Sequence, residues 1–199
     1  MKRLLIALIA SSFIGATAQS PTGSGRSPND VVERLWKGAT EGELLTPGGW
    51  NRTSRLFVKP EVFPANASIR IVSNNWGVEH SSVSNDTAEV DMEYTDAGTV
   101  DASLRYSPPP RTGFYKTATV FHLVFAPTHW TMFKSDGKAI TGKEEREGPM
   151  EWQIKEPAGL PWTTVNTAIR YVLEKREKAT DPVIRKNADE TLARLLKLH

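Results

Sequence analysis

His122 is the residue whose type and place best suit proton-transfer chemistry. It lies in the middle of the apolar, β-branched run 115–126, and imidazole is the usual general base near neutral pH. Asp91, in a second strand-like run, is a carboxylate that could orient the imidazole from across a sheet. Together the two would form a proton-transfer dyad. The alternative, which the pattern favours, is a half-buried strand histidine with a local hydrogen bond.

Three acidic residues alternate along the run 87–95. Glu89, Asp91 and Glu93 would follow one another at intervals of about 7 Å on one strand face. Neighbouring carboxylates can serve acid–base chemistry or bind a hard cation. The residues between and beside them are apolar: Ala88, Val90, Met92 and Tyr94. This alternation favours a solvated outer face of a strand over a site.

The aromatic residues are the candidates for binding a ligand. Large rings with a polar atom line pockets well, and they also fill cores. We predict that four of them contribute to a cavity for a small hydrophobic ligand: Trp36, Trp50, Tyr115 and Trp130. The alternative for Trp36 and Trp50 is that they anchor the core of the first helices.

Composition excludes several classes of protein. The chain has no cysteine, which excludes disulfides, zinc ribbons, iron–sulfur clusters and cysteine nucleophiles. His122 and His129 have no third ligand in view, so no metal site is predicted. Motifs for phosphate or dinucleotide binding are absent, and no cofactor is expected. A formal net charge of +2 gives no indication of nucleic-acid binding.

Residues 1–18 have the pattern of a secretory signal. Lys2 and Arg3 precede an apolar stretch that ends in the small residues Ala-Thr-Ala. We expect cleavage near Ala18 and a secreted or periplasmic protein without a membrane span; the alternative is an uncleaved N-terminal anchor. Removing Lys2 and Arg3 leaves 23 basic and 23 acidic residues, so the mature chain is formally neutral.

The rest of the chain divides into three parts. Residues 19–26 are rich in Ser, Gly, Thr and Pro and are expected to form a flexible leader. Residues 27–157 carry helix patterns and then strand patterns. Residues 158–199 carry two further helix patterns, which we expect to form a helical hairpin packed on the same domain.

Local signals set the expected elements. Ser27-Pro28-Asn29-Asp30 predicts a helix start, Gly42 its end, and Thr46-Pro47 the start of a second helix. Asp96-Ala97-Gly98 is expected to be a turn and 135–149 a polar loop. Strands are predicted at 68–76, 87–95, 99–106, 115–126, 128–134 and 150–155.

This order of elements indicates an α+β fold. Two N-terminal helices would pack on a curved antiparallel sheet of five or six strands, followed by the C-terminal helical hairpin. From Ser27 to Pro157 the element order and the early tryptophans resemble the nuclear transport factor 2-like superfamily, whose cone fold is shared with SnoaL-like polyketide cyclases. The resemblance implies a cone-shaped cavity and carries over no site residue. The hairpin after Pro157 departs from the family's simplest pattern.

The function we expect is non-catalytic binding of a small hydrophobic ligand or a protein partner in the cone-shaped cavity. One alternative is a proton-transfer isomerase, cyclase or dehydratase that uses His122 and Asp91. This alternative requires both side chains to converge inside the cavity. Another is a homo-oligomeric interaction protein that associates through its C-terminal helices.

Overall fold

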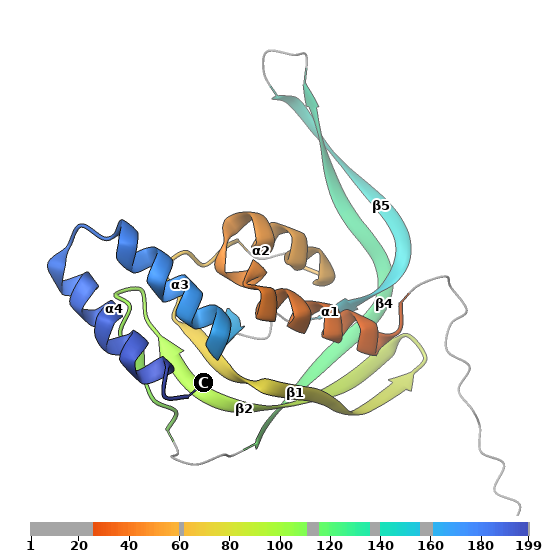
Figure 1. The fold of residues 1–199 in the computed structure, drawn as a ribbon. Coiled ribbons are helices and arrows are strands. Elements are labelled where there is room, and N and C mark those ends of the chain that lie inside the picture. Colours follow the sequence, from red (N-terminus) through yellow and green to blue (C-terminus); the bar gives the residue numbers. More distant parts are fainter. Residues whose placement is uncertain (1–25, 60–61, 111–115, 136–139, 156–160, 199) are drawn as a thin grey trace, which may run out of the picture.

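The structure is a computed structural model that describes residues 26–59, 62–110, 116–135, 140–155 and 161–198. The predicted signal, and the predicted leader up to residue 25, lie outside these ranges. Helices and strands are segregated along the described chain, which confirms the α+β class. Figure 1 shows two groups of helices on a curled sheet, with one long hairpin that rises beyond the body.

The first helix, α1 (Pro28–Glu41), begins and ends as predicted. The Asp30 backbone N–H donates to the Ser27 hydroxyl at 3.2 Å, and the Ser27 N–H donates to the Asp30 carboxylate at 2.8 Å. Gly42 ends the helix at φ 85°, a left-handed conformation that suits glycine. One apolar face is buried: Val31, Val32, Leu35, Trp36 and Ala39.

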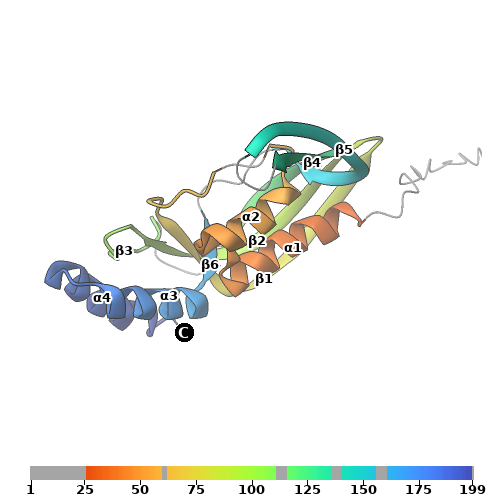
Figure 2. The ribbon, with the colours of Figure 1, turned by 90° about the horizontal axis from the view of Figure 1, so that it is seen from above.

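The second helix, α2 (Pro47–Thr53), packs closely against the chain that enters it. Thr46 caps it, because its hydroxyl accepts a hydrogen bond from the Gly49 N–H at 3.1 Å. A Cβ at Gly49 would lie 2.2 Å from the carbonyl oxygen of Glu43, so only glycine fits. Two 3-10 turns flank α2: Glu43–Leu45 and Ser54–Leu56. Figure 2 shows α1 and α2 together over one side of the sheet, which we call the covered face.

The sheet has six strands among the described residues, in the order β5–β4–β2–β1–β6, and β3 pairs with part of β2. Neighbours are antiparallel except β1 and β6, so the predicted antiparallel sheet is in fact mixed. The strands span Ile69–Ser84 (β1), Thr87–Val100 (β2), Tyr106–Ser107 (β3), Lys116–Ser135 (β4), Ile140–Ile154 (β5) and Trp162–Thr164 (β6).

The hairpin of β4 and β5 is longer than the sequence predicts. The expected polar loop 135–149 is wrong over most of its length, because β5 begins at Ile140 and runs through the charged residues. Pro127 does not divide β4; a bulge follows it instead. The side chains of 145–147 are all exposed. Neither face of this segment is buried, and the alternation that marks a half-buried strand is therefore absent.

A bulge replaces the turn predicted at 96–98. Val72 pairs with Asp96 while Ile71 pairs with Gly98, so Ala97 is an extra residue in β2. The Gly98 N–H donates to the Asp96 carboxylate at 2.9 Å, and Gly98 has φ 109°. The strand continues past this point, and its final residues face the other side of the sheet.

The chain reverses at 101–105, directly after β2 ends at Val100. The Asp101 carboxylate accepts hydrogen bonds from the N–H groups of Ser103 and Arg105 at 2.8 and 2.9 Å. The predicted return strand 99–106 is therefore reduced to the two residues of β3.

The C-terminal helices α3 (Val165–Lys178) and α4 (Pro182–Leu195) form the predicted hairpin. Ile71 and Val72 point to opposite faces of β1, as neighbours in a strand do. Val72 belongs to the core beneath α1, whereas Ile71 belongs to a second core with residues of α3 and α4. The hairpin thus covers the opposite face at one end of the sheet only.

The remainder of that opposite face, on β1, β2 and β4, has no described helix over it, and we call it the open face. In the described part of the chain, no helix has the length and apolar character needed to cross a membrane.

Candidate functional site

The three alternating carboxylates of β2 lie on the open face. Glu89 is exposed, and Asp91 and Glu93 are half-buried. The residues that alternate with them are buried beneath α1: Ala88, Val90, Met92 and Tyr94. The predicted outer face is therefore confirmed, but of the three carboxylates only Glu89 is exposed to solvent on it.

His122 also lies on the open face, outside the curve of the sheet. Its Nδ1 lies 3.3 Å from Glu89 Oε1, and its side chain is 54% exposed. Glu89 and His122 are direct cross-strand partners, whereas Asp91 is opposite Val120. The expected pairing of His122 with Asp91 is wrong, because the strand register brings a different carboxylate to the imidazole. The two residues do not converge inside a cavity.

Trp36 and Trp50 are core residues, 1% and 4% exposed. The ring of Trp36 packs against three others, with centroid distances of 5.7 Å to Trp76, 5.3 Å to Tyr94 and 5.0 Å to Trp162. These rings occupy the space between α1 and the sheet where the sequence predicted a ligand cavity. The two tryptophans follow the alternative interpretation, as anchors of the core.

The other two predicted ligand-binding residues are not placed by the structure. Tyr115 lies outside the described residues. Trp130 lies in the outer part of β4, where side chains are not described. The structure therefore does not bring the four predicted aromatic residues around one cavity.

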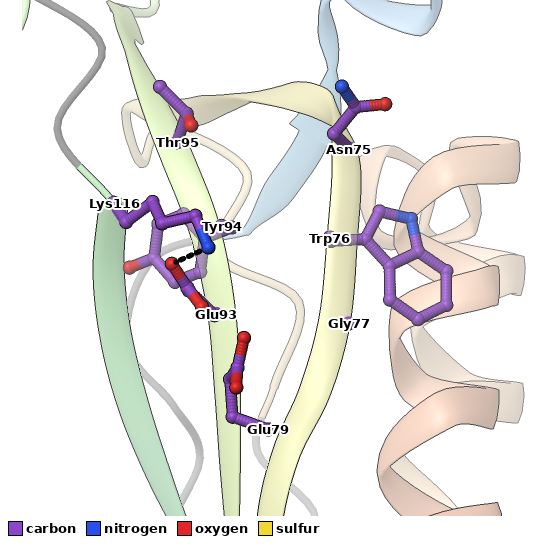
Figure 3. A pocket seen from close by; sticks show the side chains of 8 residues that line it. All are labelled: Asn75, Trp76, Gly77, Glu79, Glu93, Tyr94, Thr95 and Lys116. Carbon is purple, nitrogen blue, oxygen red and sulfur yellow. Dashed lines mark ion pairs between the residues drawn. The ribbon is translucent and has the colours of Figure 1, made fainter.

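A hollow of about 340 Å³ opens on the open face, over Gly77. Gly77 is the cross-strand partner of Glu93, and a Cβ at this glycine would meet nothing within 4 Å. The missing side chain leaves a floor of bare backbone between charged neighbours (Figure 3). The hollow is lined by Asn75, Trp76, Gly77, Glu79, Glu93, Tyr94, Thr95 and Lys116.

Glu93 is the central ionisable group of this hollow. Its Oε1 lies 2.7 Å from Lys116 Nζ, and its side chain is only 17% exposed, whereas that of Lys116 is 74% exposed. A hydrogen bond with the Glu79 carboxyl raises the pKa of Glu93, burial raises it further, and Lys116 opposes both effects. The facing carboxyls therefore favour either a shared proton or a cation between them.

A bulge brings Glu79 to Glu93. Val78 pairs with Met92 and His80 pairs with Asp91, so Glu79 is an extra residue on β1. The carboxyls come from positions fourteen residues apart in the chain. Among the described residues no group of three or more His, Cys, Asp or Glu has the arrangement of a metal site.

A second hollow, of about 360 Å³, lies further along the open face. It surrounds the contact between His122 and Glu89. Its lining is mostly polar and includes Ser82, Ser84, Thr87, Glu89, His122 and Lys155. The described part of the open face thus carries two depressions with mostly polar linings, and exposed apolar residues such as Val120 lie beside them.

Sequence reasoning missed Gly77, Glu79 and Lys116 as parts of a site. One signal for the first was present, since a glycine within a strand often marks a bulge or a place where another group approaches the backbone. The contact of Glu79 with Glu93 depends on the bulged register, which no local pattern reveals.

Comparisons with protein-family models, with curated proteins and with solved structures find no match.

Proposed function

We propose that this chain is an exported, non-catalytic binding protein that holds a cationic side chain of a protein partner in the hollow over Gly77. The observation that carries the proposal is the half-buried Glu93 carboxyl, which lies beside the Glu79 carboxyl in the lining of the hollow. The expectation of a protein partner is kept, and its site moves from the cone interior to the open face.

The electrostatics favour a cationic occupant. Two carboxylates at close range repel each other once both are ionised, and a cation between them removes the repulsion. Lys116 neutralises one oxygen of Glu93 and remains largely in solvent. An ammonium or guanidinium group that entered the hollow would form charge-assisted hydrogen bonds in partly desolvated surroundings.

The strand edge beside the hollow favours a partner that is a polypeptide. Strand β6 pairs with β1 only at Arg70–Val72. Among the described strands, none pairs with the outer edge of β1 from Trp76 to Ser84. An extended segment added along this edge would use the unpaired backbone groups and place alternate side chains over the open face.

Selection from a random peptide library against the purified protein tests the proposal. We expect enrichment of peptides with Lys or Arg in an otherwise extended, β-branched context. Glu93→Gln and Gly77→Val, which places a branched side chain in the hollow, should abolish the enrichment. Glu190→Gln, a change of the same type at an exposed residue of α4, should preserve it. Equal enrichment with the Gly77→Val variant would refute the proposed site.

A proton-transfer enzyme is the second candidate, with Glu93 in place of His122. The raised pKa of Glu93 is the property that a general acid needs at moderate pH. Turnover of an enolisable ketone that disappears in Glu93→Gln and survives in His122→Ala would favour this candidate. Absence of turnover across a panel of such ketones would count against the enzyme and favour the binding function.

Homo-oligomerisation through the C-terminal hairpin has its own observation. Large apolar side chains are exposed on and just after its helices: Leu173, Val183, Leu196 and Leu198. Light scattering should show a monomer after substitution of Val183 and Leu196 by Ser if this surface joins two copies. These variants are better than removal of 158–199, because α3 and α4 bury the second core.

Export and the family resemblance complete the proposal. Export rests on residues 1–18, and N-terminal sequencing of the secreted chain should begin after Ala18. The likeness to the cone fold of the nuclear transport factor 2-like superfamily is supported by the curled sheet over α1 (Figure 2).

A further inference from the structure

Three buried nitrogen atoms on the covered face have no hydrogen-bond partner among the described residues: Nε1 of Trp36, Nε of Arg70 and Nε1 of Trp162. We call these three residues the donor cluster. Trp36 and Trp162 are 1% and 4% exposed. A buried N–H group without an acceptor destabilises the folded protein, so three in one region require an explanation.

The three side chains lie together. Arg70 and Trp162 are register partners on the neighbouring parallel strands β1 and β6, which puts them on the same face. The ring of Trp36 lies 5.0 Å from that of Trp162 and 5.3 Å from that of Tyr94. The Tyr94 hydroxyl lies 3.1 Å from Arg70 Nη1. One small region between α1, β1 and β6 therefore holds all three side chains.

The chemistry of this region is one-sided. Indole N–H and guanidinium groups only donate hydrogen bonds, so the cluster has donors and lacks acceptors. Arg70 adds a positive charge, and no described carboxylate lies within ion-pair distance of it. Arg70 contacts Tyr94 through Nη1. The edge of the guanidinium group formed by Nε and Nη2 takes no part in this contact.

We propose that the donor cluster binds the carboxylate group of a small acid. A carboxylate is planar and matches the two parallel N–H groups of the Nε–Nη2 edge of an arginine. The two indole N–H groups would supply further donors, and the carboxylate would neutralise Arg70. A water molecule could accept hydrogen bonds but would leave the charge without a partner. This site lies on the opposite face of the sheet from the hollow over Gly77, although Tyr94 lines the hollow and also contacts Arg70.

The test is titration of the folded protein with sodium acetate, followed by the indole ¹H–¹⁵N resonances. Trp36→Phe and Trp162→Phe assign the two signals. We expect both to move with one saturable curve, while sodium chloride at equal ionic strength leaves them in place. Arg70→Lys, which keeps the charge and loses the planar edge, should bind acetate about tenfold more weakly. Arg105→Met, at an exposed turn residue, should bind as the wild type does.

Several outcomes would overturn the proposal. These are unmoved signals in acetate, equal movement in chloride, or unchanged acetate binding in Arg70→Lys. A crystal structure in acetate that shows each indole N–H over a neighbouring ring, with water at Arg70, would also overturn it. Where Arg70→Lys fails to fold, the contrast between acetate and chloride in the wild type decides the question.

Discussion

The two faces of the sheet have opposite chemistry although the same strands supply both. On the covered face, β2 contributes buried apolar residues and the core contains nitrogen donors without acceptors. On the open face, the alternate residues of β2 are acids, and facing carboxyls raise the pKa of Glu93. The covered face is filled by aromatic rings, whereas the open face is hollow where Gly77 has no side chain. The same strands therefore present a buried, ring-filled surface on one side and an acidic, hollowed surface on the other.

Truncating a ring of the covered face should have the largest effect. Trp36→Ala removes a fully buried side chain that packs against three other rings, and we expect a loss of about 3–5 kcal/mol in the free energy of unfolding. Urea denaturation measures it. Val120→Ala, at a position 46% exposed on the open face, should cost less than about 0.5 kcal/mol. Similar losses in the free energy of unfolding for Trp36→Ala and Val120→Ala would contradict the assignment of one face to the core and the other to solvent.

Two glycines give the next contrast. Gly49→Ala places a Cβ against the backbone of Glu43 and should destabilise the protein by about 1–3 kcal/mol. Gly77→Ala places a Cβ in open space and should leave stability unchanged or raise it by up to about 1 kcal/mol, since alanine is less costly than glycine in a strand. Thermal unfolding of the two variants measures both. A strongly destabilised Gly77→Ala protein would mean that the hollow is closed.

The smallest expected effect is in pH dependence. The raised pKa of Glu93 means that the folded state holds this proton more tightly, so the free energy of unfolding falls as pH rises above the ordinary glutamate value of about 4.3. Glu93→Gln removes that fall, and its stability relative to the wild type should increase with pH through this window. Urea denaturation at a series of pH values measures the difference.

Glu174 provides a control of opposite sign. A hydrogen bond from Lys178 lowers the pKa of Glu174, so its stabilising contribution is present above about pH 4.3 and is lost as pH falls through the lowered pKa. Glu174→Gln should be slightly less stable than the wild type near neutral pH, and the difference should close in acid. If the stability difference from the wild type changed with pH in the same direction for Glu93→Gln and Glu174→Gln, the arrangement around Glu93 would be contradicted.

Features encoded by neighbouring residues were predictable from the sequence. The cap at Ser27 and Asp30 set the start of α1, and helical spacing set its buried face. The alternation around Asp91 correctly assigned the acids of β2 to the face opposite the apolar core. Each of these depends on groups within a few positions of one another, so local physics suffices.

Features that depend on pairing between distant strands were not predictable. The extra residue Ala97 changes the face of β2, and the extra residue Glu79 brings a carboxyl to Glu93. His122 met Glu89 and not Asp91, because the register of β2 with β4 decides the contact. The charged part of β5 gave no strand signal, since a strand exposed on both faces needs no apolar residues.

The central claim is that the hollow over Gly77 receives a cationic side chain of a partner. Calorimetric titration of one library-selected basic peptide into the wild type and into Gly77→Val tests it most directly. The account predicts at least about tenfold weaker binding to the variant, with an unchanged thermal midpoint. Replacement of the peptide's basic residue by norleucine should weaken binding to the wild type by a similar factor. Equal affinity of the two proteins for the basic peptide would contradict the account.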